Sequence, residues 1–529
     1  MLRTHSIESQ VTTRSSQRLT AARVLPVLTG LALIGLALLN LTLYPRPWFD
    51  EGSHLHVPKT LVTYGVYADY SSEGFRYFGP SIGIGPTVML PIAASFKVFG
   101  IGLLQARLVM VAYLLVAVFA CFVLARRLGG SRLAWFAVLI LAGSQAIGLL
   151  ETGRQVLGEV PALAFLALGW AVWLAAETRL TARPLVLAGA LFGLSAITKN
   201  QTALLLLPTL FVAWLANLVY YRRQPQRYFL IPLTVAVAVY GVWQLIVMAF
   251  LGSGTLSENL ALLRQFTSGA ALVFSPNLMI RSVNLLLGQD TLAGWIVPVV
   301  IYGVFVGLRR TADGQRWGNV MIFVLGGLAW YVFASISWLR YAFMPLALVT
   351  FVAAKLLDQL LSYAAPQARA WWSDCRRGET RAALAPVVLA VFVMMSLLPL
   401  SLTARHILKP PSPDVQYVAE YLNANIARDA LIETWEPELG FLTNHRYHFP
   451  QQALLDTSVR HIWLSGPSPA SQYNFQTYSP EYVIVGEFAK YVGLYSPDEL
   501  ANDYHLIESF GAYDVYAHNG LSAAPASSP

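Results

Sequence analysis

Eleven apolar runs of membrane-spanning length are the feature that most constrains how this chain can fold. They lie at about residues 24–43, 106–125, 132–150, 159–176, 184–198, 201–220, 228–250, 293–308, 318–335, 341–361 and 385–403. Most are long enough, as helices, to cross the hydrocarbon core of a bilayer, which is about 30 Å thick. Only 12% of the 529 residues are charged, about half the fraction usual in a soluble domain. The chain is therefore predicted to be a polytopic membrane protein.

Arginines gather in alternate connections between these runs, and their placement predicts the orientation. They are Arg126, Arg127 and Arg132; Arg179 and Arg183; Arg222, Arg223 and Arg227; Arg309, Arg310 and Arg316; and Arg369, Arg376, Arg377 and Arg381. Positive charge beside membrane spans favours the cytoplasmic side. Together with the basic N-terminal tail, the pattern predicts a multi-pass cell-membrane protein with a cytoplasmic N-terminus and an extracytoplasmic C-terminus. The same bias accounts for the net charge of +8 without a nucleic-acid partner.

The composition changes along the chain and predicts four parts. These are a cytoplasmic tail at 1–23, a transmembrane module at 24–403, a soluble extracytoplasmic α/β domain at 404–521 and a disordered tail at 522–529. In the C-terminal domain we expect a helix over 414–427 and strands at 430–435 and 482–485. The fold class is thus mainly α and polytopic, with a small extracytoplasmic α/β domain.

Two stretches are predicted to form long outer loops. The first spans about 44–105 and contains an apolar segment, 81–100, that is interrupted by Pro86 and Pro91 and contains Lys97. If this segment crossed the membrane, the connection that carries Arg126 and Arg132 would lie on the outer side, against the orientation bias. We therefore predict that the segment is a juxtamembrane or re-entrant element. The second loop, 251–291, includes an amphipathic stretch at about 256–266.

Ionisable residues cluster at the predicted outer ends of the spans. They are Asp50, Glu51, Arg76, Arg107, Glu151, Arg154, Glu159, Lys199 and Arg340. Outer cations run against the orientation bias and need a partner. One interpretation is that they pair with the neighbouring carboxylates and reach toward the interface. The other is a site in which a carboxylate acts as a base while the cations hold a phosphate. A polyprenyl-phosphate sugar, whose tail lies in lipid and whose phosphate lies at the interface, fits the second interpretation.

The order of several short motifs resembles one family of membrane enzymes. The motifs are Phe49-Asp50-Glu51, Arg76-Tyr77-Phe78, Phe96-Lys97-Val98-Phe99-Gly100, Gln105-Ala106-Arg107-Leu108, Ala125-Arg126-Arg127-Leu128-Gly129, Thr198-Lys199 and Arg340-Tyr341 with Pro345. In this order they resemble the GT-C-fold integral-membrane glycosyltransferases of the protein O-mannosyltransferase and lipid A aminoarabinose transferase superfamily. Two positions depart from that pattern: residues 79–86 replace a Lys/His-Pro-Pro-Leu element, and Glu159 replaces an aspartate.

The resemblance implies a hexosyl or other glycosyl transfer from a polyprenyl-phosphate sugar at the outer face. Asp50 matches the catalytic acid residue, and Glu51 is its neighbour. Arg107, Lys199 and Arg340 match positions near the donor phosphate, and Arg76, Arg154, Glu159 and Tyr341 are further candidates for substrate binding. Asp50 would take the proton of an acceptor hydroxyl with inversion at the anomeric carbon. The acceptor, which is a lipid, a glycan or a protein, stays open.

Other readings of the same residues remain. A divalent metal is possible if His54, His56 and the carboxylates of Asp50, Glu51 and Glu159 converge, although residues two apart on a helix point in different directions. No cofactor is assigned. The alternative function is a transporter or flippase of a lipid-linked or anionic substrate, and a third is a non-catalytic envelope scaffold. The scarcity of charge at the predicted span centres argues against transport.

Overall fold

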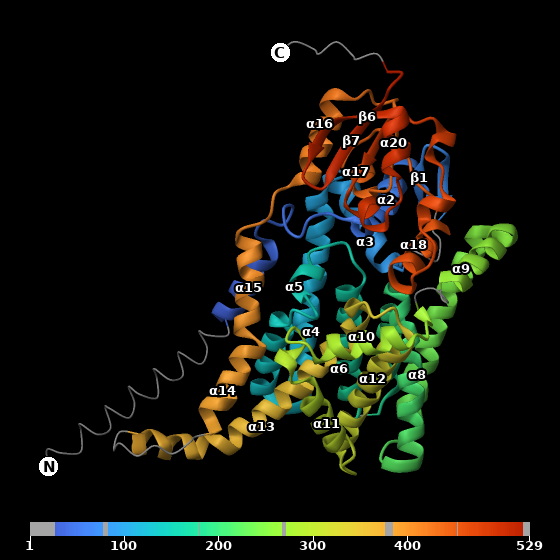
Figure 1. Cartoon of the computed structure of the whole chain (residues 1–529). Helices are drawn as coiled ribbons and strands as arrows, with labels where there is room; N and C mark the ends of the chain where they lie inside the picture. The colour runs from blue at the N-terminus through green and yellow to red at the C-terminus, as the bar shows by residue number, and fades with distance from the viewer. Residues whose placement is uncertain are drawn as a thin grey trace, which may run out of the picture.

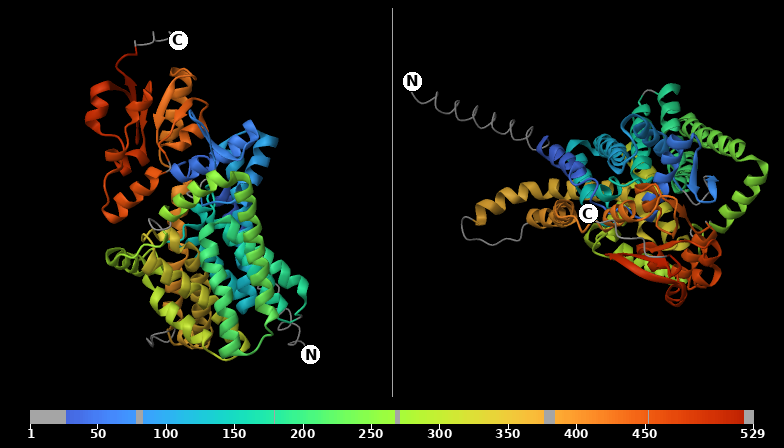
Figure 2. Two further views of the ribbon diagram at one scale, coloured as in Figure 1. Left: turned by 90° about the vertical axis from the view of Figure 1, so that its right-hand side faces the viewer. Right: turned by 90° about the horizontal axis from the view of Figure 1, so that it is seen from above.

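A computed structural model describes residues 27–77, 83–178, 180–266, 271–375, 384–451 and 453–521. A bundle of long apolar helices lies below a smaller α/β domain in Figure 1, and the left view of Figure 2 shows the same division. The predicted tails, 1–23 and 522–529, lie outside the described residues, as do positions 79–82 of the motif that departs from the family pattern.

The bundle contains seven helices that are long and apolar enough to cross a membrane, among the described residues. Shorter apolar helices accompany them, including Val27–Leu38. The labelled helices are α3 (Pro86–Phe99), α4 (Leu103–Gly143), α5 (Leu149–Thr152), α6 (Glu159–Ala176), α7 (Ala182–Thr198), α8 (Asn200–Ala216), α9 (Arg227–Phe266), α10 (Pro276–Leu287), α11 (Ile296–Gly307), α12 (Ala312–Ala334), α13 (Phe343–Cys375), α14 (Leu384–Met395) and α15 (Leu397–Leu408). The prediction of a mainly α, polytopic fold is confirmed, whereas eleven spans stay a prediction.

The bundle differs in two details from what the sequence indicates, and α3 is too short for a full span. The runs 106–125 and 132–150 fall largely on α4, which breaks at Gly129 and Gly130. Gly130 has a φ of 88°, a conformation that glycine adopts without steric cost. The second predicted loop is largely helical, because α9 continues to Phe266 and α10 follows it. At 14 residues, α3 is about 21 Å long, shorter than the bilayer core.

The C-terminal domain is built on a five-stranded sheet with the order β4-β3-β5-β7-β6. Its strands are β3 (Leu431–Thr434), β4 (Arg446–His448), β5 (Tyr482–Val485), β6 (Tyr504–Phe510) and β7 (Tyr513–His518). Strand β3 pairs in parallel with β4 and β5, whereas β7 pairs antiparallel with β5 and β6. The helices of the domain are α16 (Asp414–Asn425), α17 (Pro437–Leu442), α18 (Ala453–Leu464), α19 (Glu487–Val492) and α20 (Pro497–Asp503). The predicted helix and strands therefore coincide with α16, β3 and β5.

The predicted first outer loop is folded and packs against this domain. It forms α2 (Phe49–Tyr64) and a hairpin of β1 (Ala68–Ser71) and β2 (Gly74–Tyr77). Lys59 on α2 donates hydrogen bonds to the carbonyl oxygens of Gly440, Phe441 and Thr443, at 2.8, 3.1 and 2.8 Å. These carbonyls lie at the end of α17, where helix carbonyls lack partners and the helix dipole favours a cation. The loop and the C-terminal domain thus form one unit above the bundle.

Lys59 is expected to hold this unit together. Burial lowers the pKa of Lys59 to about 8, and Lys59→Met would leave three carbonyls without their cationic donor. Thermal unfolding in detergent should show a loss of about 2–4 kcal/mol. Lys97→Met, at an exposed lysine on α3 of the same predicted loop, serves as the matched control. Equal stability of the two variants would contradict this role.

Two buried glutamates lie where α2 meets α17. Glu436 accepts a hydrogen bond from the Ala489 N–H at 2.9 Å, and Glu438 accepts one from the Tyr513 hydroxyl at 2.8 Å. Burial raises the pKa of both carboxyls, that of Glu438 to about 7, and the charge of Glu438 adds to the effect on Glu436. A carboxyl that is harder to ionise in the folded state destabilises the fold as the pH rises.

Stability is therefore expected to fall between about pH 4.5 and pH 7, the ordinary and the folded pKa of Glu438. Over this window the folded state binds more protons than the unfolded state, so the free energy of unfolding decreases with pH. The decrease in the free energy of unfolding that Glu438 contributes should reach about 2–3 kcal/mol. Glu438→Gln should make the pH profile measured by thermal unfolding shallower, and the slope that is left should come from Glu436. An unchanged slope in this variant would contradict the assignment.

Candidate functional site

The adjacent acids Asp50 and Glu51, in the first turn of α2, have opposite environments. The Glu51 side chain is 0% exposed and that of Asp50 is 27% exposed. Glu51 forms a two-pronged ion pair with Arg107, at 2.9 and 2.5 Å, and accepts the Val156 N–H at 3.1 Å. Arg107 also donates to the Leu41 carbonyl at 2.6 Å. Glu51 therefore ties α2 to α4 and to the segment before α6, which leaves Asp50 as the acid open to a ligand.

Asp50 belongs to a chain of charges that joins distant parts of the sequence. Its carboxylate pairs with the guanidinium of Arg340. Arg340 also donates to both oxygens of Glu159, at 2.7 and 3.2 Å, and Lys199 pairs with Glu159 at 3.0 Å. The four side chains balance two negative charges with two positive ones. The structure thus brings together four of the residues that the sequence singled out, in the paired form that the first interpretation expected.

Lys199 owes its position to a break between two helices. Helix α7 ends at Thr198 and α8 begins at Asn200, so Lys199 alone is extended, with φ −143° and ψ 116°. This backbone makes an antiparallel bridge with Ile84, and the Gly85 N–H donates to the Thr198 carbonyl at 3.1 Å. A helix break leaves backbone N–H and carbonyl groups without helical partners, and such a break is tolerated only where protein buries it or where it lines a cavity. Here the segment at Ile84 and Gly85 supplies the partners.

Two tryptophans flank Arg340. Arg340 lies in the short helix η4 (Leu339–Ala342), just before α13. The guanidinium lies 5.7 Å from the Trp48 ring centroid and 5.2 Å from that of Trp338. Aromatic faces attract a cation and do not compete for its N–H groups. The rings therefore hold the guanidinium while its donors remain directed at carboxylates.

A cavity of about 80 Å³ opens beside Asp50. It is bounded by α2, the β1–β2 hairpin and the C-terminal domain; the lining residues are Phe49, Asp50, Ser53, His54, Asp69, Arg76, Trp435, Pro437, Phe449, Pro450 and Leu455. Arg76 pairs with Asp69 at 2.5 Å. Burial alone would raise the pKa of Asp69, but Arg76 and His56 outweigh it and hold that pKa at about 2. The wall that faces Asp50 is thus partly charged and partly aromatic.

The other predicted site residues lie nearby in different roles. Arg154 is buried and donates to the carbonyls of Leu36, Leu39 and Tyr44, which ties it to the first apolar helix and its end. Tyr341 stacks on Trp330, with ring centroids 5.6 Å apart. The phosphate-binding role of Arg107 stays a prediction, and its contacts in this structure are with Glu51 and Leu41.

The two histidines of α2, His54 and His56, are hydrogen-bonded within the protein. His54 Nδ1 lies 2.7 Å from the Val156 carbonyl, and burial lowers the pKa of His54 to about 4. His56 bridges Asp69 and the Pro437 carbonyl, each at 2.7 Å. Among the residues that the structure describes, no group of three or more His, Cys, Asp and Glu side chains is arranged to hold a metal ion.

Sequence reasoning missed the close approach at Gly52. A Cβ at this position would lie 2.2 Å from the Glu438 nitrogen and 2.7 Å from its Cα. Only glycine lets α2 pack this closely on the backbone of α17. The adjacent glycine in Asp50-Glu51-Gly52 was the available signal, but the partner backbone is several hundred residues away in the chain.

Comparison with known proteins agrees with this architecture. Residues 84–246 match the family described as dolichyl-phosphate-mannose-protein mannosyltransferase. The fold resembles ArnT from Cupriavidus metallidurans bound to undecaprenyl phosphate, with a TM-score of 0.62 and 15% identity over 96% of this chain and 99% of that one. The apo state of the same ArnT has a TM-score of 0.63 and is 15% identical, over 94% of this chain and 98% of that one.

The chain has the GT-C fold. The resemblance inferred from the ordered motifs is thereby confirmed. A further GT-C protein, the oligosaccharyltransferase AglB from Archaeoglobus fulgidus in complex with an inhibitory peptide and a dolichol-phosphate, has a TM-score of 0.56. It is 13% identical over 93% of this chain and 74% of its own. No curated protein matches the sequence.

The two acids of this GT-C chain are expected to respond differently to substitution. Glu51→Gln leaves the buried Arg107 guanidinium without a counter-charge, which should destabilise the protein by about 3–5 kcal/mol. Asp50→Asn should leave thermal stability within about 1 kcal/mol, because its side chain is partly solvated. Thermal unfolding of both purified variants measures this. An equal loss of stability in both would contradict the division of roles.

Gly52→Ala should separate α2 from α17. The added methyl meets backbone atoms, which cannot move away as a flexible side chain does, so overpacking should cost about 1–3 kcal/mol. Thermal unfolding should show this loss, and Gly241→Ala is the matched control because a Cβ there meets nothing within 4 Å. If Gly52→Ala were as stable as the control, the close approach would not constrain the fold.

Proposed function

We propose that this protein is a glycosyltransferase that moves a sugar from a polyprenyl-phosphate donor to an acceptor hydroxyl at the outer face of the membrane. The observation that carries the proposal is Asp50, an accessible carboxylate beside a cavity, with Arg340 and Lys199 next to it. The GT-C fold supports it, as does the presence of a polyprenyl phosphate in two of the three structures named above. The matched family, described by its dolichyl-phosphate-mannose donor, supports a hexose as the transferred sugar.

Asp50 acts in this proposal as the general base. An acceptor oxygen attacks the anomeric carbon of the donor sugar while its proton passes to the Asp50 carboxylate. The new C–O bond forms as the bond between that carbon and the phosphate oxygen breaks, and the phosphate leaves with the electron pair. Attack and departure take place on opposite faces, so the anomeric configuration inverts. A positioned base of this kind contributes about 10²–10⁴-fold to the rate.

Arg340 and Lys199 meet the charge of the departing phosphate. In the structure both cations are paired with carboxylates, so an incoming phosphate competes with Asp50 for the guanidinium of Arg340. Release from Arg340 frees the Asp50 carboxylate to accept the proton of the acceptor while the donor is bound. The cavity of about 80 Å³ is smaller than the usual volume of a ligand pocket, about 300–1,000 Å³. Donor binding is therefore expected to widen it.

The proposal places the sheet domain outside the membrane and the N-terminus inside. Helix α8 starts at the site and continues with η1 (Asn217–Tyr221), and α12 ends just before η4. The connections that carry Arg222 and Arg223, and Arg309 and Arg310, therefore lie at the end of the bundle away from the sheet domain (Figure 1). An arginine-rich end favours the cytoplasmic side, which supports this orientation.

Transport is the alternative that the arrangement favours less. A transporter needs polar groups near the middle of the bilayer. Here Glu159 begins α6, Lys199 separates α7 from α8, and Arg340 precedes α13. The charges around Asp50 therefore lie at helix ends on one side of the bundle, as a surface-facing transferase requires.

Asp50→Asn is the direct test of the proposed chemistry. The amide keeps the size of the carboxylate and loses its basicity, so sugar transfer from a radiolabelled polyprenyl-phosphate hexose should fall about 10²–10⁴-fold. Arg340→Met should lose about 10²–10³-fold, the usual effect of removing one electrostatic contact to a developing charge. The measurement is turnover by the purified protein in detergent with an acceptor extract from the same envelope.

Asp498→Asn, at an exposed aspartate of the C-terminal domain, is the matched control and should keep full activity. Transfer by Asp50→Asn at the wild-type rate would remove Asp50 as the base. Movement of the labelled lipid across the bilayer without sugar transfer would favour the transporter.

A further inference from the structure

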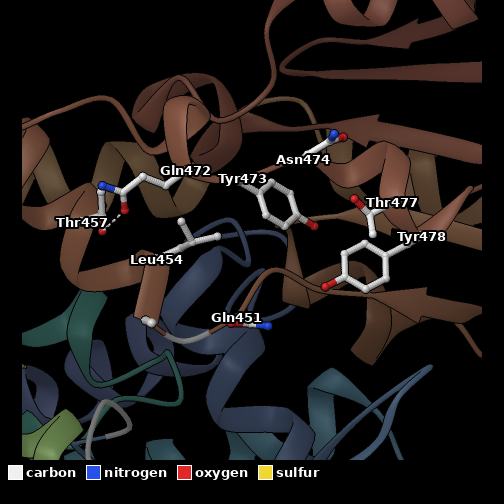
Figure 3. A pocket seen from close by; sticks show the side chains of 9 residues that line it. Gln451, Leu454, Thr457, Gln472, Tyr473, Asn474, Thr477 and Tyr478 are labelled. Carbon is white, nitrogen blue, oxygen red and sulfur yellow. Dashed lines mark hydrogen bonds between the residues drawn. The ribbon is translucent and has the colours of Figure 1, made fainter.

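A second and larger cavity lies within the C-terminal domain. It has a volume of about 360 Å³ and lies between α18 and the segment that forms η5 (Pro469–Gln472) and η6 (Phe475–Tyr478). Its lining residues are Gln451, Ala453, Leu454, Thr457, Gln472, Tyr473, Asn474, Thr477 and Tyr478. None of these residues is charged. Figure 3 shows the two tyrosines with Thr477 on one side of the space, Leu454 and Thr457 on the other, and Gln451 below.

The tyrosines are held from behind by a buried polar network. The Tyr473 hydroxyl donates to Glu433 at 2.6 Å, and the Tyr495 hydroxyl donates to the same oxygen at 2.9 Å. The other Glu433 oxygen is hydrogen-bonded to His448, whose ring stacks on Tyr478 with centroids 3.7 Å apart. Glu433 and His448 are 0% and 1% exposed. Two aromatic faces are thus fixed before any ligand arrives, which reduces the entropy lost on binding.

The lining is suited to a ligand with many hydroxyls and no charge. Three carboxamides, two threonine hydroxyls and the Tyr478 hydroxyl offer both hydrogen-bond donors and acceptors. The Tyr473 hydroxyl already donates to Glu433 and the Thr457 hydroxyl to Gln472, so Tyr473 offers its ring face. An anionic ligand would need arginine or lysine, which the lining lacks, and a purely apolar ligand would leave the amides without partners. A neutral sugar presents hydroxyls at its rim and C–H groups on its faces, which match the amides and the tyrosine rings. The volume lies at the lower end of the range for small-ligand pockets, about 300–1,000 Å³, and suits one or two sugar rings.

This cavity and the one beside Asp50 share a wall. Phe449, Pro450 and Leu455 line the cavity beside Asp50, whereas Gln451 and Leu454 line the second cavity. Leu454 and Leu455 are consecutive residues of α18 that border different cavities. A ligand bound in the second cavity is therefore separated by α18 and the segment at 449–451 from the cavity that Asp50 lines.

We propose that the second cavity binds a neutral sugar residue of the acceptor, so that the acceptor is itself a glycan or a glycosylated molecule. Its role as an acceptor subsite rests on the proposed function, whereas sugar binding as such does not. The sugar held in this cavity anchors the acceptor while another hydroxyl of the same molecule reaches Asp50. The cavity is then a specificity site, separate from the groups that take part in the reaction.

Binding to the full-length protein in detergent tests the proposal without turnover. The probes are mannotriose, maltotriose, galactotriose and N,N′,N″-triacetylchitotriose, each titrated to about 10 mM, with ligand-observed NMR and calorimetry as readouts. This range covers the millimolar affinity of a weak single-subsite contact. At least one should bind. Gln451→Ala and Gln472→Ala, both at exposed side chains, should each weaken binding about fivefold or more. Asn425→Ala, an exposed carboxamide on α16, should bind as the wild type does.

The outcomes separate this proposal from the proposed function. Asp50→Asn should bind the same trisaccharide with unchanged affinity, because Asp50 lines the other cavity. Absence of binding by all four probes would overturn the inference, as would equal binding by the Gln451 and Gln472 variants and the control. In the transfer assay, Gln451→Ala should raise the KM for the acceptor with little change in kcat. A drop in kcat alone would contradict a subsite that only holds the acceptor.

Discussion

Arg340 is the residue on which the rest of the site depends, because it binds two carboxylates at once. Asp50 comes from the first turn of α2 and Glu159 from the start of α6, and Arg340 itself precedes α13. Charge-assisted hydrogen bonds from one planar guanidinium fix these three segments relative to one another. The same contact masks the carboxylate that the proposed reaction uses. A ligand phosphate that takes over the guanidinium would therefore couple donor binding to the release of the base.

This arrangement works only if α2 is held in place from outside the bundle. Gly52 allows α2 to meet the α17 backbone, and Lys59 satisfies the carbonyls at the end of that helix. Glu51, buried against Arg107, ties α2 to α4. The C-terminal domain is thus part of the site's architecture, and it supplies Trp435, Phe449 and Leu455 to the cavity beside Asp50.

Local patterns in the sequence predicted the apolar helices, the strands β3 and β5, and the grouping of Asp50, Glu159, Lys199 and Arg340. These predictions succeed because apolar runs and outer charges are read from neighbouring residues. The pairing inside the group could not be read in this way. Asp50 and Glu51 are adjacent in sequence and chemically similar, and only the packing of α4 beside Glu51 makes one of them structural. The break at Lys199 depends on a bridge to Ile84, more than a hundred residues away, and the docking of α2 on α17 joins parts still further apart.

A structure of the full-length protein with a short-chain polyprenyl phosphate bound would test the central claim most directly. The account predicts that the phosphate lies within ion-pair distance, about 4 Å, of both Lys199 Nζ and the Arg340 guanidinium. It also predicts that the contact between Arg340 and Asp50 is lost or lengthened in that complex. A phosphate bound away from these two cations, with Arg340 and Asp50 still paired, would contradict it.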